Sequence, residues 1–293
     1  MNAKRFRGTG VALVTPFDSE GKIDFESLRK LIEHVIAGGV EFLVALGTTA
    51  ETPTLSDEEK KEVLRFVAAV NQKRLPLVCG IGGNNTREVL NQFENYPLDD
   101  VDAILSVSPY YNKPTQQGIY AHFKLLNDHA PKPIILYNVP GRTGSNMGSD
   151  LTIRLAHECE QIIGIKEACG QMGQSMELVK NCPADFTILS GDDDLSMAQI
   201  ACGFDGVISV AANCFTRTFT DMVRFSLNQQ FVEARKLQYQ LLDGIALLFA
   251  EGNPAGVKAF LNKKGICQNQ FRLPVVPVSE KTAQSIHAFA DLA

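Results

Sequence analysis

The run Ile162-Ile163-Gly164-Ile165-Lys166 decides the fold class. Its apolar, β-branched residues predict a buried β-strand, and that strand ends in a lysine. Burial disfavours the charged form of a lysine, and the neutral amine is a nucleophile that attacks carbonyl carbons to form an imine. A lysine at a strand end can also extend its ammonium to the surface, so position alone leaves both roles open.

Similar short apolar runs recur along the chain, and each is followed by a longer amphipathic run. The capping-box pattern from Ser56 to Glu59 marks the start of one such helix. Eight strands that alternate with helices predict parallel pairing and closure into a (β/α)₈ barrel. The predicted strands are 11–15, 42–46, 77–80, 103–107, 134–138, 162–166, 187–190 and 206–210, and the other helices start near Asp24, Thr86, Gln117, Ser149, Gln171, Asp192 and Thr216.

The strand signal stops after about residue 225, and three further helical patterns follow at 231–249, 254–263 and 280–292. These helices exceed what a barrel requires. We therefore expect an α/β protein with a catalytic barrel domain at 1–225 and a C-terminal three-helix appendage at 226–293.

Composition excludes several classes of function. The 293 residues carry a net charge of −5, which argues against a nucleic-acid partner, and no apolar run is long enough for a membrane span. The first ten residues are basic but are followed by no apolar segment, so we expect no secretory signal. The seven cysteines form no CxxC pair, which predicts reduced thiols and a cytoplasmic location.

Cofactor and metal signatures are weak. The run from Gly80 to Gly83 lacks the spacing of a dinucleotide fingerprint, and the five histidines form no HExxH pattern. The acidic run from Asp192 to Asp194 is better interpreted as a helix cap than as a cation site. We therefore expect neither an organic cofactor nor a metal.

Functional groups of a (β/α)₈ barrel gather at the C-terminal ends of its strands. At those positions the sequence places a lysine, two tyrosines that can relay protons, hydroxyl groups before a turn, and an arginine that can bind a carboxylate with two hydrogen bonds. These residues are Lys166, Tyr111, Tyr137, Thr48, Thr49 and Arg142. Each has a structural explanation on its own, but together they provide what an imine-forming enzyme for an α-keto acid requires.

With these motifs assembled, the chain resembles the dihydrodipicolinate synthase / N-acetylneuraminate lyase family of class I pyruvate-dependent aldolases over nearly its whole length. The most specific segments are 47–51 (GTTAE), 110–114 (YYNKP), 137–144 (YNVPGRTG) and 164–167 (GIKE). Arg142 and the paired threonines resemble the synthase branch more than the sialic acid lyase branch.

The resemblance implies a role for each site residue. Lys166 forms the Schiff base with pyruvate, Tyr137 moves protons, and Thr49 and Tyr111 extend the relay, with Tyr111 reaching into a neighbouring subunit. Thr48 and Thr49 hold the pyruvate carboxylate, Arg142 receives the carboxylate of aspartate semialdehyde, and Ile208 and Gly191 lie nearby. The usual assembly is a homotetramer built as a dimer of dimers.

The chain departs from the family pattern in two places. Ala50 stands where a glycine is common, which is tolerable only if its backbone is not left-handed. Asp57 and Lys60 stand where the lysine-inhibited branch often has histidines, while Asn84, Glu88 and Tyr110 match a possible allosteric lysine site. Two alternatives remain open: a sister aldolase or lyase for a sugar keto acid, and a barrel that only binds a keto acid.

Overall fold

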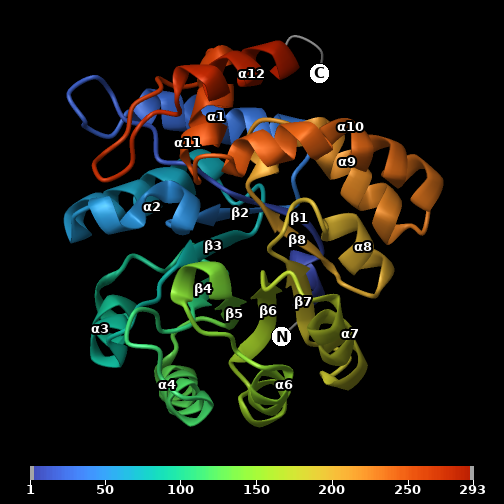
Figure 1. The fold of residues 1–293 in the computed structure, drawn as a ribbon. Helices are drawn as coiled ribbons and strands as arrows, with labels where there is room; N and C mark the ends of the chain where they lie inside the picture. The colour runs from blue at the N-terminus through green and yellow to red at the C-terminus, as the bar shows by residue number, and fades with distance from the viewer. Residues whose placement is uncertain (1–2, 291–293) are drawn as a thin grey trace.

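The computed structural model describes residues 3–290 and confirms the predicted (β/α)₈ barrel. Eight parallel strands pair in chain order and the eighth closes on the first (Figure 1). The strands are β1 Gly8–Ala12, β2 Phe42–Ala45, β3 Leu77–Gly80, β4 Ala103–Val107, β5 Ile134–Asn138, β6 Ile162–Glu167, β7 Thr187–Ser190 and β8 Gly206–Ser209.

Helices surround the barrel, and the last ones pack together over one side of it (Figure 1). The α-helices are α1 Phe25–Gly38, α2 Asp57–Asn71, α3 Thr86–Asn95, α4 Gln116–His129, α5 Pro140–Thr143, α6 Ser149–Glu158, α7 Met172–Asn181, α8 Ser196–Ala201, α9 Thr216–Leu227, α10 Phe231–Phe249, α11 Ala255–Lys263 and α12 Glu280–Ala290. The 3₁₀ turns are η1 Ala3–Phe6, η2 Thr48–Ala50, η3 Thr52–Thr54 and η4 Ala211–Asn213.

The first strand begins three residues earlier than its apolar run predicts. β1 covers Gly8–Ala12, whereas residues 13–15 are buried but lie beyond the strand. Glycine is a poor strand former, so the pattern at Gly8 and Gly10 gave no strand signal. Gly10 is needed for packing, because a Cβ there would lie 2.1 Å from a ring carbon of Phe42.

The predicted capping box at the start of α2 is confirmed: the Ser56 side chain accepts from the Glu59 amide, and the Glu59 side chain accepts from the Ser56 amide. The prediction that the acidic run 192–194 caps the next helix is wrong. α8 begins at Ser196 without a side-chain cap. The buried Asp193 carboxylate instead accepts from the amides of Val210 and Ala211, at 3.1 and 2.8 Å, because the start of η4 offers donors inside the barrel mouth.

A bulge in β6 directs Lys166 into the barrel. Ile134 pairs with Ile162 but Ile135 pairs with Gly164, so one residue of β6 is left over. The extra residue reverses the alternation of the two faces beyond it. As a result Ile165 packs in the outer layer between strands and helices, and Lys166 faces inward beside Tyr137.

The three helices predicted after the barrel are α10, α11 and α12, and the predicted positions 291 and 292 of the last one lie outside the described residues. Aromatic rings join α11 and α12 to the η4–α9 region, because Phe215 contacts Phe260 and Phe289 with ring centroids 4.9 and 5.7 Å apart. The predicted domain boundary after residue 225 falls in the last turn of α9, and the division into two domains stays a prediction. Among residues 3–290, no helix combines the length and apolar character needed to cross a membrane.

Candidate active site

Lys166 and Tyr137 lie side by side at the mouth of the barrel. They are paired residues of neighbouring strands, so both project inward at the same level. Lys166 is only 5% exposed and Tyr137 6%. The Lys166 Nζ atom lies 4.4 Å from the centre of the Tyr137 ring. A primary amine is thus held in a confined space next to a phenol.

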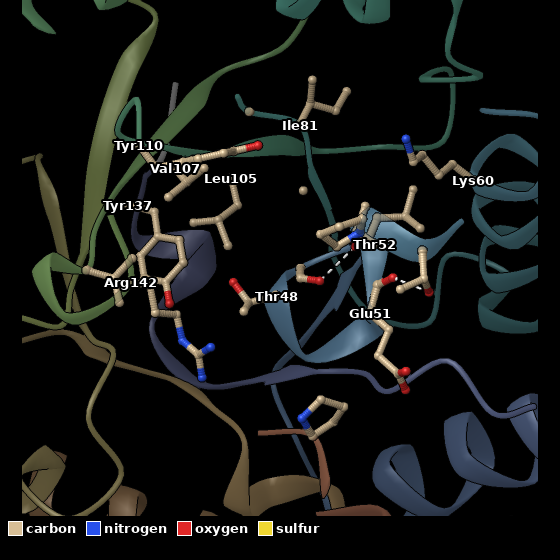
Figure 2. A pocket seen from close by; sticks show the side chains of 18 of the residues that line it. Thr48, Glu51, Thr52, Lys60, Ile81, Leu105, Val107, Tyr110, Tyr137 and Arg142 are labelled. Carbon is tan, nitrogen blue, oxygen red and sulfur yellow. Dashed lines mark hydrogen bonds between the residues drawn. The ribbon is translucent and has the colours of Figure 1, made fainter. Parts of the chain in front are cut away.

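The threonine pair forms the η2 turn directly after β2. Thr49 is buried, and its hydroxyl accepts a 3.0 Å hydrogen bond from the side-chain amide of Asn253. Thr48 is exposed, and Figure 2 shows its hydroxyl directed toward Tyr137 and Arg142. The left-handed residue of this turn is Glu51 (φ 53°), so Ala50 occupies its position without that strain.

A cavity of about 580 Å³, here the central cavity, opens above Lys166. It brings together groups from six strand ends and from α10, and its wall is apolar on the α10 side. The residues that define it are Thr48, Thr49, Tyr137, Arg142, Lys166, Gly191, Asp192, Asp193, Leu242, Ile245, Phe249 and Asn253, among others. Gly191 leaves room for the lysine, because a Cβ there would lie 3.0 Å from the Lys166 Cε atom.

Arg142 lies in the short helix α5, at the rim of the same cavity. It is exposed, and it also lines a second cavity of about 490 Å³, here the side cavity. The two cavities share Thr48, Tyr137 and Arg142 (Figure 2). The guanidinium therefore stands where a carboxylate could enter the central cavity from outside.

Asp192, which lies in the acidic run predicted to contain a helix cap, is a residue of the site. It lines the central cavity with Lys166. Burial raises the pKa of its carboxyl from 3.8 to about 6; the charge of Asp194 adds to this shift and the Lys166 charge opposes it. Its Oδ2 atom has no hydrogen-bond partner among the described residues. The carboxyl therefore titrates inside the site.

This titration makes stability depend on pH. Because the folded pKa of Asp192 lies above the unfolded one, the cost of ionising it is absent below about pH 4 and complete above about pH 6. We expect Asp192→Asn to stabilise the fold by up to about 3 kcal/mol at pH 7.5 and hardly at all at pH 4. Urea unfolding at both pH values checks this, with Asp185→Asn in the exposed turn before β7 as the control. An equal gain at both values would contradict the assignment.

Glu167 supports the lysine from the opposite face of β6. Its buried carboxylate accepts from the side-chain amides of Asn138 at 2.9 Å and Gln174 at 3.0 Å, and from the amide of Cys169 at 2.9 Å. Burial raises the pKa of this carboxyl, and these hydrogen bonds oppose the shift. The network ties the ends of β5 and β6 together and fixes the level at which Tyr137 and Lys166 meet.

Two predicted site residues lie apart from the central cavity. Ile208 is fully buried in the inner layer of the barrel, and Val210, two residues later, lines the cavity instead. Tyr111 is 87% exposed with a left-handed backbone (φ 71°), and it lines neither cavity in the described part of the chain. A single subunit therefore does not bring Tyr111 to Lys166.

The residues matched to an allosteric site meet only in part. The Asn84 side chain donates to the Tyr110 carbonyl at 3.2 Å, and Tyr110 lines the side cavity, whereas Glu88 does not. Lys60 lines the same cavity and pairs with Asp57 at 3.0 Å. The Lys60 ammonium holds the pKa of Asp57 below its usual value.

Comparison with known proteins agrees with this geometry. A model of the dihydrodipicolinate synthetase family matches residues 5–292. A 4-hydroxy-tetrahydrodipicolinate synthase from Azobacteroides pseudotrichonymphae is 49% identical over 280 residues, which cover 96% of this chain and 95% of the relative. The dihydrodipicolinate synthase structure from Aquifex aeolicus has a TM-score of 0.95 at 38% identity and covers 98% of each chain.

A further solved structure carries a ligand. The chloride-inhibited dihydrodipicolinate synthase from Acinetobacter baumannii, complexed with pyruvate, has a TM-score of 0.94 at 36% identity, and the match covers 98% of this chain and all of that one. The similarity thus extends through the barrel and the C-terminal helices alike. The chain belongs to the dihydrodipicolinate synthetase family.

Proposed function

We propose that this protein is a 4-hydroxy-tetrahydrodipicolinate synthase, which condenses pyruvate with L-aspartate 4-semialdehyde in the diaminopimelate route to lysine. The observation that carries the proposal is the buried Lys166 amine, facing the Tyr137 ring in a cavity that also contains the threonine pair and Arg142. Relatives that share nearly the whole chain carry this name.

The proposed reaction begins when the Lys166 amine attacks the pyruvate ketone. Loss of water from the carbinolamine gives an imine, and loss of a methyl proton gives the enamine. The enamine carbon then attacks the aldehyde, and the amino group of the semialdehyde displaces Lys166 as the ring closes. Tyr137 is the side chain best placed to move protons at the imine nitrogen, since it faces Lys166 from the adjacent strand.

The two carboxylates of the substrates need separate receptors. We assign the pyruvate carboxylate to the threonine pair, because the first amides of the η2 turn have no acceptor within the turn and hydroxyl groups lie beside them. We assign the semialdehyde carboxylate to Arg142, which lies at the rim where the second substrate enters. Gly191 keeps the space over Lys166 open, and Ile208 shapes the barrel floor.

Trapping with borohydride tests the proposal directly. Reduction in the presence of pyruvate should add the mass of one reduced pyruvate adduct to the chain, and peptide mapping should place it on Lys166. The same preparation is then assayed with pyruvate and a panel of aldehydes, with each product identified by mass. Absence of labelling would exclude imine chemistry, and turnover limited to sugar keto acids would favour the sister aldolases.

Arg142→Ala should separate the two substrates. Loss of a carboxylate receptor is expected to lower kcat/KM for aspartate semialdehyde about 10²-fold, because hydrogen bonds to charged groups are among the stronger ones. Borohydride trapping with pyruvate should stay at the wild-type level. Arg154→Ala, on the outer helix α6, is the control for loss of a surface arginine. An unchanged kcat/KM for aspartate semialdehyde would show that Arg142 does not bind the carboxylate of this substrate.

We further propose a homotetramer built as a dimer of dimers, in which Tyr111 completes a neighbouring subunit's relay. The 87% exposure of an aromatic side chain on the loop after β4 supports a contact with a second chain. Mixing Tyr111→Phe subunits with Lys166→Ala subunits should then restore part of the activity that each homogeneous variant lacks. A mixture as inactive as its parents would mean that each site is built from one chain.

Two minor assignments follow. The unpaired state of all seven cysteines supports a cytoplasmic location. Asn84, Glu88 and Tyr110 remain the predicted contacts of an inhibitory lysine. Lys60 lines the side cavity, and its ion pair with Asp57 leaves less net positive charge to repel such a ligand than Lys60 alone would.

A further inference from the structure

A buried ion pair links the C-terminal helices to the threonine turn. Lys258 of α11 donates from Nζ to the carboxylate of Glu51, and the two side chains are 0% and 1% exposed. The same ammonium donates to the carbonyl of Gln270 at 3.0 Å and lies 4.3 Å from the centre of the Phe17 ring. Burial lowers the pKa of Lys258, and the Glu51 charge opposes that shift.

An ion pair in such surroundings is weak evidence for stability. Desolvation of two charges offsets most of their attraction, and apolar residues of the same volume often stabilise a fold as well or better. In some proteins a buried pair instead restricts a segment to one arrangement. The segment restricted here is the one that carries the threonine pair, since Glu51 follows Ala50 directly.

The second oxygen of Glu51 extends the link. It accepts from the amide of Arg272 at 3.2 Å. The Arg272 guanidinium binds both oxygens of Glu59, at 2.8 and 2.6 Å, and donates to the Thr54 and Gly21 carbonyls at 2.9 Å. Figure 1 shows the connection between α11 and α12 beside the loop that follows β1.

The turn is also held from its other side. Asn253, just before α11, donates to the Thr49 hydroxyl at 3.0 Å, while the Glu51 amide donates to the Thr48 carbonyl at 3.3 Å. Glu51 itself adopts a left-handed backbone, which is strained for a residue other than glycine and persists where its surroundings fix it. In Figure 2 its carboxylate points away from Thr48, outside the reacting space.

We propose that Glu51 and Lys258 are positioning residues, which hold the Thr48-Thr49 turn in the shape that receives the pyruvate carboxylate. This inference rests on the proposed function. Neither side chain lines the central cavity around Lys166. Their loss should therefore weaken capture of pyruvate more than it slows the later steps at Tyr137.

The test compares Lys258→Met, Glu51→Gln and the double variant with both changes. Each single change should lower the melting temperature, because it leaves the remaining buried charge, on Glu51 or on Lys258, without its counter-charge. The double variant removes both charges and should melt close to the wild type. We expect the double variant to keep a KM for pyruvate at least about 10-fold above the wild-type value, with kcat lowered less. Arg74→Gln, which breaks an exposed ion pair with Glu33, is the control.

The outcomes are distinct. A stable double variant with a raised KM for pyruvate, and with half-saturation of borohydride trapping at higher pyruvate, supports positioning. Wild-type KM and trapping in that variant would overturn it and leave a purely structural pair. Lys258→Arg keeps the positive charge and should recover part of the affinity lost in Lys258→Met. Trapping of wild-type protein on Lys166 checks the proposed function separately, because it does not depend on this pair.

Discussion

Lys166→Arg is expected to abolish imine formation and to lower kcat by about 10⁴-fold or more, because arginine keeps the charge but has no nucleophilic amine at neutral pH. The side chain is buried at the end of β6, with the Tyr137 ring beside its amine and Gly191 close to its Cε atom. Stopped turnover and loss of the borohydride adduct are measured on the same preparation.

The control for this variant is Lys180→Arg, a change at the end of α7, away from the barrel mouth. It should trap pyruvate as the wild type does. Lys166→Met tests a further point: it removes the amine without adding bulk, so its melting temperature separates crowding from chemistry. A trapped adduct that persists in either Lys166 variant would show that another lysine carries the imine.

The strands were predictable because each of them is buried on both faces. Parallel strands covered by helices give continuous apolar runs, and seven of the eight strands lie within one residue of the predicted bounds. β1 was misplaced because Leu13 and Val14 are buried as deeply as strand residues while the strand itself contains three residues of small side chain, Gly8, Gly10 and Ala12. An apolar run indicates that its residues are buried. It indicates a strand only where the buried residues also have strand backbone.

The sequence could not reveal which face of β6 carries Lys166. In a regular strand, successive side chains point inward and outward in turn. The bulge after Ile162 adds one residue, so every residue beyond it points to the face opposite to the one that regular alternation predicts. The one local signal is Gly164, because a glycine inside a strand often marks a bulge, but β-branched Ile163 fits a regular strand equally well. Only the pairing with β5 determines that the amine faces the cavity.

Long-range partners account for the residues that sequence reasoning missed. Asn253 reaches Thr49 across 204 positions, and Lys258 reaches Glu51 across 207. Local capping is the common role of aspartates before a helix, so the pattern predicts a cap within the run that contains Asp193. Its actual donors at Val210 and Ala211 lie 17 and 18 positions away, on the next strand end. Such contacts follow from barrel closure and are invisible to local patterns.

Tyr137→Phe is the second change with a large expected effect. Removing the hydroxyl should lower kcat by about 10²–10⁴-fold, the usual range for loss of a positioned acid or base. The ring remains, so its contact with the Lys166 amine and its packing in the inner layer are kept. We therefore expect pyruvate trapping to be slower but still directed to Lys166, which a rapid-quench time course with borohydride would show.

The two threonines provide matched variants for the same relay. Family resemblance assigns the relay hydroxyl to Thr49, but in this chain that hydroxyl is buried and accepts from Asn253, while the exposed Thr48 hydroxyl faces Tyr137. We expect Thr48→Val to lower kcat about 10²-fold and Thr49→Val mainly to raise the KM for pyruvate. Valine keeps the shape of threonine, so both effects report the hydroxyl. If Thr49→Val lowers kcat and Thr48→Val mainly raises the KM for pyruvate, the relay hydroxyl is that of Thr49. A fully active Tyr137→Phe variant would show that the Tyr137 hydroxyl is not part of the relay.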